Sequence, residues 1–174
     1  MKLKFTLTLA LVYLGTGLFA QSSYKQAVGA RVSPVSNYDA FAASYKVFLA
    51  EQPALEFNLG IGSDRYYYSP YDYGARTTAV SATAAYQHHF DIKPVKGLKW
   101  YVGGGATVFH SSSKYDPYKG VSVGLFPTGG ADYKFAKIPL NVSADWRPTF
   151  LVAKTDQYSD FYGDGFGISA RYTF

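Results

Sequence analysis

The last nine residues alternate apolar and polar side chains without a break. Phe166, Ile168, Ala170, Tyr172 and Phe174 fall on one face of an extended chain, and Gly167, Ser169, Arg171 and Thr173 fall on the other. Successive side chains of a β-strand point to opposite faces, so a period of two indicates a strand with one apolar and one polar face. The chain therefore ends in a strand that separates two environments.

The same alternation recurs in seven earlier segments. The expected strands cover about 24–32, 38–49, 55–62, 79–90, 98–108, 121–135, 140–152 and 166–174. Their polar faces consist of Gly, Ser and Thr with isolated charges of both signs, which suits a narrow polar interior better than an open surface. Segments of about 10 residues that alternate in this way are typical of transmembrane barrels. We therefore expect an all-β fold, a closed antiparallel eight-stranded up-and-down transmembrane β-barrel without free sheet edges.

The composition agrees with a barrel. The chain has 17 tyrosines, 13 phenylalanines and 17 glycines but only two glutamates, Glu51 and Glu56, a balance that favours strands and turns over long helices. After residue 20 no apolar run reaches the roughly 18 residues of a transmembrane helix. Without cysteine, the fold must be held by hydrogen bonds and packing. The basic residues are scattered, which argues against nucleic acid as a partner.

The first 20 residues have the layout of a secretory signal peptide. Lys2 and Lys4 precede an apolar run from Leu9 to Phe19, and Ala20 stands directly before a polar stretch. A basic start, an apolar run and a small residue at its end are typical of such peptides, whereas a retained membrane helix needs roughly 20 apolar residues. We expect residues 1–20 to be cleaved and residues 21–174 to form the outer-membrane barrel domain.

The links between the expected strands differ in length in a regular way. Glu51–Pro53, Asp91–Gly97 and Ala136–Pro139 are short, whereas Tyr66–Arg76, Ser111–Gly120 and Thr155–Gly165 are longer and rich in tyrosine; the first link, Ser33–Asn37, is a short exception. Outer-membrane barrels have short periplasmic turns and longer external loops. This polarity places both termini in the periplasm and the barrel among outer-membrane lipid and lipopolysaccharide.

The expected external loops repeat a theme of tyrosine, aspartate and proline. Tyrosine offers a rigid amphipathic contact surface at a low entropic cost, so such loops suit the recognition of a protein or a glycan. The candidate recognition residues are Tyr67, Tyr71, Tyr73, Tyr115, Tyr118, Tyr158 and Tyr162. The alternative is that these loops pack on one another and on lipopolysaccharide.

Alternate residues of each expected strand point into the lumen, and we say that these positions have inward parity. Ten charged residues occupy such positions. They are Lys25, Arg31, Lys46, Glu56, Lys99, Asp132, Lys134, Asp145, Arg147 and Arg171. An eight-stranded barrel is just wide enough for side chains to fill it. The set is therefore either an ion-paired plug that stiffens the barrel or the lining of a narrow pore, and large side chains of both signs favour the plug.

Two groups of residues carry a resemblance to a known family. Gly129–Phe135, Ile138–Asn141 and Asp145–Pro148 resemble the small outer-membrane β-barrel proteins of Bacteroidota, which are porin-like or similar to outer-membrane protein A. The ending Arg171–Phe174 resembles the terminal strand that the barrel assembly machinery reads, with Tyr172 and Phe174 as its aromatic signal. The resemblance implies an eight-stranded barrel that this machinery inserts into the outer membrane, and it implies little about activity.

Pro127 and Pro148 fall inside neighbouring expected strands, and both have outward parity. Proline cannot donate to a strand ladder, so each marks a bulge or a local parting of strands. One interpretation is a kink that shapes the barrel. The other is a lateral gap that admits a lipid chain, similar to the proline-bounded gaps of the outer-membrane palmitoyltransferase of lipid A.

A lipid-modifying activity needs catalytic groups near the external rim. The candidate set is His110 with Ser111, Ser112, Ser113 and Asp116, which are residue types that acyl transfer uses. The set is similar to the His and Ser that the lipid A deacylase barrels use together with a Glu. Here both glutamates lie at the opposite, periplasmic end of the expected barrel, so that pattern is broken. We therefore expect a barrel without catalytic residues, metal or cofactor, structural or part of a larger assembly. A lipid A-modifying acyl hydrolase or acyltransferase is the alternative.

Overall fold

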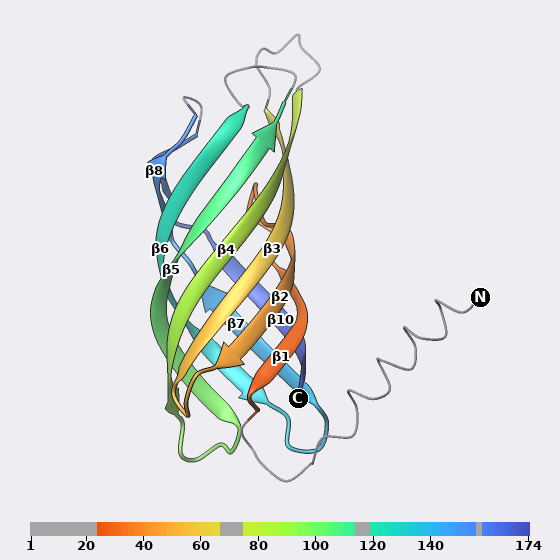
Figure 1. Ribbon diagram of the computed structural model, residues 1–174, viewed down its shortest axis with the longest axis vertical. Helices are drawn as coiled ribbons and strands as arrows, with labels where there is room; N and C mark the ends of the chain where they lie inside the picture. The colour runs from red at the N-terminus through yellow and green to blue at the C-terminus, as the bar shows by residue number, and fades with distance from the viewer. Residues whose placement is uncertain (1–23, 67–74, 114–118, 156–157) are drawn as a thin grey trace, which may run out of the picture.

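Ten strand segments form one antiparallel sheet in the computed structural model, which describes residues 24–66, 75–113, 119–155 and 158–174 (Figure 1). They are β1 (Gln26–Val32), β2 (Phe41–Phe48), β3 (Pro53–Tyr66), β4 (Ala75–Asp91), β5 (Leu98–Ser112), β6 (Gly120–Lys134), β7 (Leu140–Trp146), β8 (Thr149–Ala153), β9 (Phe161–Tyr162) and β10 (Phe166–Thr173). β7 and β8 are two parts of one barrel strand, and β9 and β10 are two parts of another. The barrel therefore has eight strands.

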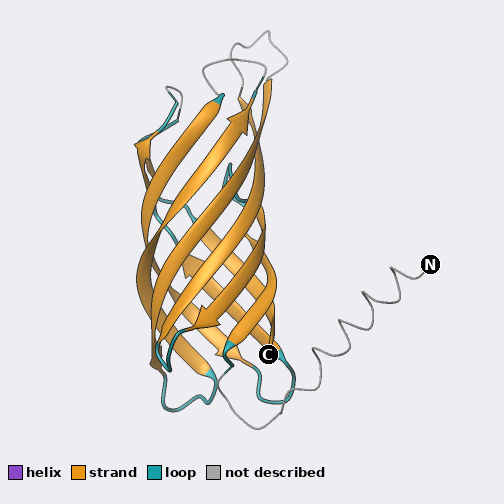
Figure 2. Cartoon of the chain, in the orientation of Figure 1, coloured by secondary structure: helices purple, strands orange, loops and turns teal. Residues whose placement is uncertain are grey.

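The sheet closes on itself between the first and the last strand. β1 pairs antiparallel with β10 in a register that sets Ala30 opposite Ala170, and β5 pairs with β6. Figure 2 shows strands and turns throughout the described chain. No helix among the described residues is long and apolar enough to cross a membrane. The expected closed eight-stranded antiparallel barrel is confirmed.

The two ends of the barrel differ. The C-terminus and the links 49–52, 92–97 and 135–139 lie at one end, which we call the turn end (Figure 1). The ends of β3 and β5 and the beginnings of β4 and β6 lie at the opposite end, which we call the loop end. The expected alternation of link lengths thus corresponds to two distinct ends of the molecule.

Several strands depart from the expected bounds at the loop end. β3 continues to Tyr66 and β4 begins at Ala75, so both reach past the segments 55–62 and 79–90. The apolar alternation stops near Gly62 because strand residues beyond the apolar band no longer need an apolar outer face. The sequence also gave no sign of β9, which lies within the expected link Thr155–Gly165.

The barrel is apolar outside and polar inside. Large apolar side chains are exposed on every wall, among them Phe41, Leu59, Val80, Val108, Val121, Phe150 and Ile168. The fully buried side chains are mostly polar, with Arg31, Arg171 and Lys46 among the largest. Exposing so much apolar surface to water is unfavourable, whereas contact with lipid chains is not. The surface is therefore that of a membrane-spanning barrel.

Candidate functional site: the barrel lumen and its two ends

Glu56 lies at the centre of the lumen and holds two guanidinium groups. Its Oε1 is 2.7 Å from Nη2 of Arg147 and 3.0 Å from Nη2 of Arg171. Gln87 donates to its other oxygen at 2.8 Å, and Asn58 donates to Oε1 at 3.1 Å. These partners come from β3, β4, β10 and the β7–β8 break, so one carboxylate joins opposite walls of the barrel.

A second carboxylate, Asp145, extends this network toward the loop end. It is 2.6 Å from Nη2 of Arg31 and 3.0 Å from Nε of Arg147. Arg31 also pairs with Asp39 at 3.1 Å. Gly167 leaves room for this arrangement, because a Cβ at that position would collide with the Arg31 guanidinium. The β1 arginine is therefore fixed between two acidic residues.

Asp39 had outward parity in the expected strand 38–49, but β2 begins only at Phe41, so Asp39 lies in the β1–β2 link and its side chain is buried. Burial raises the pKa of its carboxyl above the ordinary value, while the nearby Arg31 guanidinium opposes that rise. Backbone N–H of Asp39 donates to Ser36 at 3.2 Å, which holds the short link folded inward. The one short link at the loop end thus supplies a lumen charge.

A third cluster lies toward the turn end. Lys46 Nζ is 2.5 Å from Asp132 Oδ2 and 3.3 Å from His89 Nε2. Asn141 donates to the other oxygen of Asp132, and Tyr24 donates to Oδ2 at 3.3 Å. The lysine and its carboxylate, from β2 and β6, are therefore both enclosed by polar partners.

The buried charges balance. Among the residues whose burial the structure describes, four basic residues, Arg31, Lys46, Arg147 and Arg171, face four acidic residues, Asp39, Glu56, Asp132 and Asp145. The cavity beside Arg147 and Thr149 measures about 20 Å³, room for one water molecule. Paired charges of both signs around so small a cavity favour an ion-paired plug over the lining of a pore, and we call these eight residues the plug.

Three lysines with inward parity lie outside this plug, around the mouth of the lumen at the turn end. Lys99 is partly exposed and pairs with Asp91 at 3.2 Å, and Lys25 is exposed. Lys134 donates to the carbonyl oxygens of Phe135 and Ile138 at 2.6 and 2.9 Å. At the end of a strand a long side chain can reach past the rim to water, so parity alone does not place its charged group.

A cluster of aromatic side chains packs inside the barrel at the loop end. Tyr158 is only 3% exposed and packs with Ala79, Phe109 and Leu151. Its hydroxyl lies 2.6 Å from Oγ of Ser111. Tyr38 stacks on Phe109 with ring centroids 4.4 Å apart. We call this cluster the loop-end cap.

The loop-end cap corrects part of the expected recognition surface. Tyr158 belongs to the cap and Tyr162 is partly buried against it, so neither is a free surface tyrosine. Tyr158 points inward, which the pattern of residue types could not indicate. Tyr67, Tyr71, Tyr73, Tyr115 and Tyr118 lie outside the described residues.

Among the described residues, the expected acyl-transfer set is divided between the two faces of β5. His110 is exposed on the outer face of β5, whereas Ser111 points inward to Tyr158. Ser112 shares the outer face with His110, Ser113 follows the end of β5, and Asp116 lies outside the described residues. Neighbouring strand residues point to opposite faces, so His110 cannot activate Ser111.

The prolines interrupt one ladder. β6 pairs with β7 as far as Gly129 opposite Trp146, and with β8 from Leu125 opposite Phe150. If either register is extended into the gap between them, Pro127 lies directly opposite Pro148. Pro127 is exposed, whereas Pro148 is buried despite its outward parity, because the chain leaves the strand conformation at this point.

The two prolines remove both donors of one ladder pair. N–H groups of a strand alternate between its two neighbours, and that of Arg147 donates to Gly165 on the β10 side at 2.9 Å. Position 148 therefore faces β6, where neither proline has an N–H. The cavity of about 20 Å³ behind this break is too small for an acyl chain, which favours the kink over the lipid gap.

Restoring these donors is expected to close the ladder. In a Pro127→Val, Pro148→Val variant, the two new amides should exchange with deuterium about tenfold more slowly than unbonded amides, because each hydrogen bond contributes about 1 kcal/mol. Amide exchange measured by NMR checks this, with Pro94→Val in the exposed β4–β5 turn as the control. Fast exchange at both sites would show that something else holds the strands apart.

The expected assembly signal lies on the outer wall at the turn end. Tyr172 and Phe174 are 40% and 42% exposed, and their rings stack with centroids 6.4 Å apart. Both are accessible from the membrane side of the barrel. Their role in recognition by the assembly machinery stays a prediction.

Comparison with known proteins concerns the fold. No family model and no curated protein sequence matches the chain. Among solved structures, the crystal structure of Neisserial surface protein A is similar, with a TM-score of 0.50 and 17% identity over 88% of this chain and 98% of that one. The resemblance to the Bacteroidota family stays a prediction. The chain therefore has a closed, outer-membrane-like eight-stranded barrel fold.

Proposed function

We propose that the protein is an integral outer-membrane barrel that acts as a rigid, non-conducting scaffold, structural or part of a larger assembly. The observation that carries this proposal is the balanced plug, in which eight buried charges from several strands fill the lumen around a cavity of about 20 Å³. A hydrated ion needs a continuous water path, and such a plug leaves none at that level. Its work then lies at the surfaces that the two ends present.

The orientation follows the usual layout of such barrels. The turn end would face the periplasm, with both termini there, and the loop end would face outward. Short links and the C-terminal aromatic pair at one end support this orientation. The similarity to Neisserial surface protein A, a protein described as a surface protein, agrees with exposure of the loop end. The tyrosine-rich links would then meet a protein or glycan partner.

Two measurements on the refolded protein test the scaffold. We expect the unboiled barrel to migrate differently from the boiled chain in a detergent gel, because a closed hydrogen-bonded barrel resists detergent until it is heated. In planar bilayers we expect no conductance steps. An Arg31→Ala, Arg147→Ala variant, which removes two large plug side chains, serves as the control for a barrel with an opened lumen. Steps from the wild-type protein would contradict the non-conducting scaffold, and identical migration would contradict the membrane barrel.

A further inference from the structure

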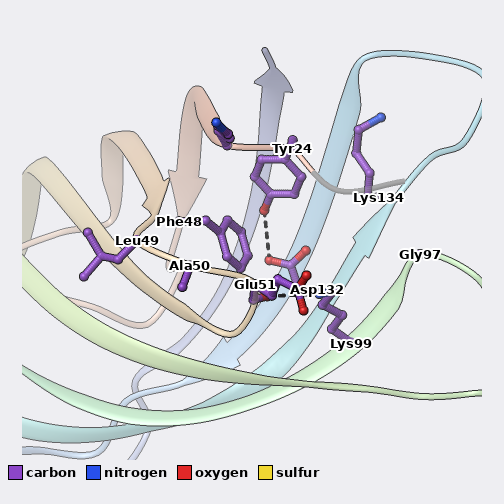
Figure 3. A pocket seen from close by; sticks show the side chains of 10 residues that line it. Tyr24, Phe48, Leu49, Ala50, Glu51, Gly97, Lys99, Asp132 and Lys134 are labelled. Carbon is purple, nitrogen blue, oxygen red and sulfur yellow. Dashed lines mark hydrogen bonds between the residues drawn. The ribbon is translucent and has the colours of Figure 1, made fainter. Parts of the chain in front are cut away.

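A cavity of about 320 Å³ opens at the turn end of the lumen (Figure 3). Its lining residues are Tyr24, Lys25, Phe48, Leu49, Ala50, Glu51, Gly97, Lys99, Asp132 and Lys134. This volume is within the range of small-molecule sites, at its lower end. Neither the plug nor the scaffold role makes use of this space.

The rim of the cavity carries an excess of positive charge. Three lysines, Lys25, Lys99 and Lys134, oppose a single rim carboxylate, Glu51. Asp132 on the floor is already paired with Lys46 at 2.5 Å. Among the described residues, no carboxylate pairs with Lys25 or Lys134. Lys99 pairs with Asp91, and the Lys134 ammonium donates to two backbone carbonyl oxygens, which leave its charge uncompensated. The net positive charge at the mouth therefore favours an anion.

One wall of the cavity is aromatic and apolar. The rings of Tyr24 and Phe48 meet edge to face, with centroids 5.1 Å apart and an interplanar angle of 86°. Leu49 and Ala50 add apolar atoms to the lining of the cavity. An inorganic ion would leave such a surface unused, whereas a ligand with an apolar part would cover it.

The rim is held in place by backbone contacts. Gly97 adopts a φ of +86° and accepts a hydrogen bond from the N–H of Lys134 at 2.8 Å. A Cβ at Gly97 would collide with the carbonyl oxygen of Lys134, so glycine lets the β4–β5 turn approach β6. Lys99 is steadied by Asp91 and by the carbonyl oxygen of Glu51 at 3.4 Å. A rim fixed in advance lowers the entropic cost of binding.

We propose that this turn-end cavity binds a small organic anion, with a carboxylate or phosphate head at the lysines and an apolar body against Phe48. Lysine binds either head as a point charge, which is why both are included. In the orientation proposed above, the ligand would enter from the periplasm. The site does not depend on the lumen being closed, so it goes beyond the scaffold role.

An NMR titration of the refolded mature barrel in detergent tests the site. Benzoate and phenyl phosphate serve as probes with the two heads, benzyl alcohol as the uncharged analogue, and inorganic phosphate as the head alone. We expect saturable shifts at the amides of Phe48, Gly97 and Lys134 with one or both organic anions, and at least tenfold weaker binding of the other two compounds. Comparing benzoate with phenyl phosphate shows which head the site prefers.

Variants separate the cavity from the general charge of the turn end. Lys134→Gln and Phe48→Ala should each weaken binding of the preferred anion about tenfold, the size of one lost charge-assisted contact or one lost aromatic wall. Lys93→Gln, an exposed lysine of the same end outside the cavity, should leave it unchanged. An equal loss with Lys93→Gln, equal binding of benzyl alcohol, or no saturable shift would overturn the proposal. Heat-modifiable migration of each variant verifies that it has folded.

Discussion

Glu56→Gln is expected to lower the free energy of unfolding by about 3–5 kcal/mol, the usual cost of removing one partner from a buried ion pair. Glu56 is 0% exposed and faces Arg147 and Arg171 at 2.7 and 3.0 Å. Glutamine keeps the shape of the side chain but removes the charge, so two guanidinium groups lose their shared carboxylate. Water cannot replace it, since the surrounding lumen is filled.

The other glutamate of the chain provides the control. Glu51 is exposed in the β2–β3 turn, so Glu51→Gln makes the same chemical change where water screens it and should alter stability by less than about 0.5 kcal/mol. Urea unfolding in lipid vesicles, followed by the fluorescence of Trp100 and Trp146 on the outer wall, measures both variants. Equal effects of the two substitutions would mean that the central carboxylate does not hold the plug together.

The barrel itself could be predicted from the sequence because its physical constraint repeats in every strand. Lipid outside and packed polar groups inside impose a period of two, which Phe166 to Phe174 show most clearly. The same parity places Arg31, Glu56 and Arg171 inside, where the structure has them. A pattern that depends only on position along one strand is therefore readable without coordinates.

The pairing of the charges could not be predicted in this way. Which guanidinium meets Glu56 depends on the tilt and register of strands far apart in the chain. Tyr158 enters the lumen from a link, where no alternation applies, and Asp39 does so because β2 begins later than the expected strand 38–49. Lys99 and Lys134 have inward parity but end at the rim, because their position along the barrel axis decides whether they reach water. The plug and the turn-end cavity are thus properties of the closed sheet.

The loop-end cap leads to the second large effect. Tyr158→Ala is expected to lower the free energy of unfolding by about 3 kcal/mol, because it leaves a cavity among Ala79, Phe109 and Leu151. The surrounding strands are held in the closed sheet and cannot move in to fill that cavity. Tyr158→Phe retains the ring and loses only the contact with Ser111 at 2.6 Å, so it should cost about 1 kcal/mol. Urea unfolding of both variants separates packing from hydrogen bonding.

Tyr158→Ala also shows whether the cap or the charge network keeps the lumen closed to ions. Tyr158 belongs to the loop-end cap, whereas Glu56 and Arg147 fill the lumen at a separate level, so the plug should stay intact when the cap is lost. We therefore expect Tyr158→Ala to remain without conductance in planar bilayers although it is destabilised. Conductance steps from this variant would instead mean that the cap blocks ions and that the charge network only stabilises the barrel. A silent, destabilised Tyr158→Ala would mean that the charge network alone suffices to keep ions out.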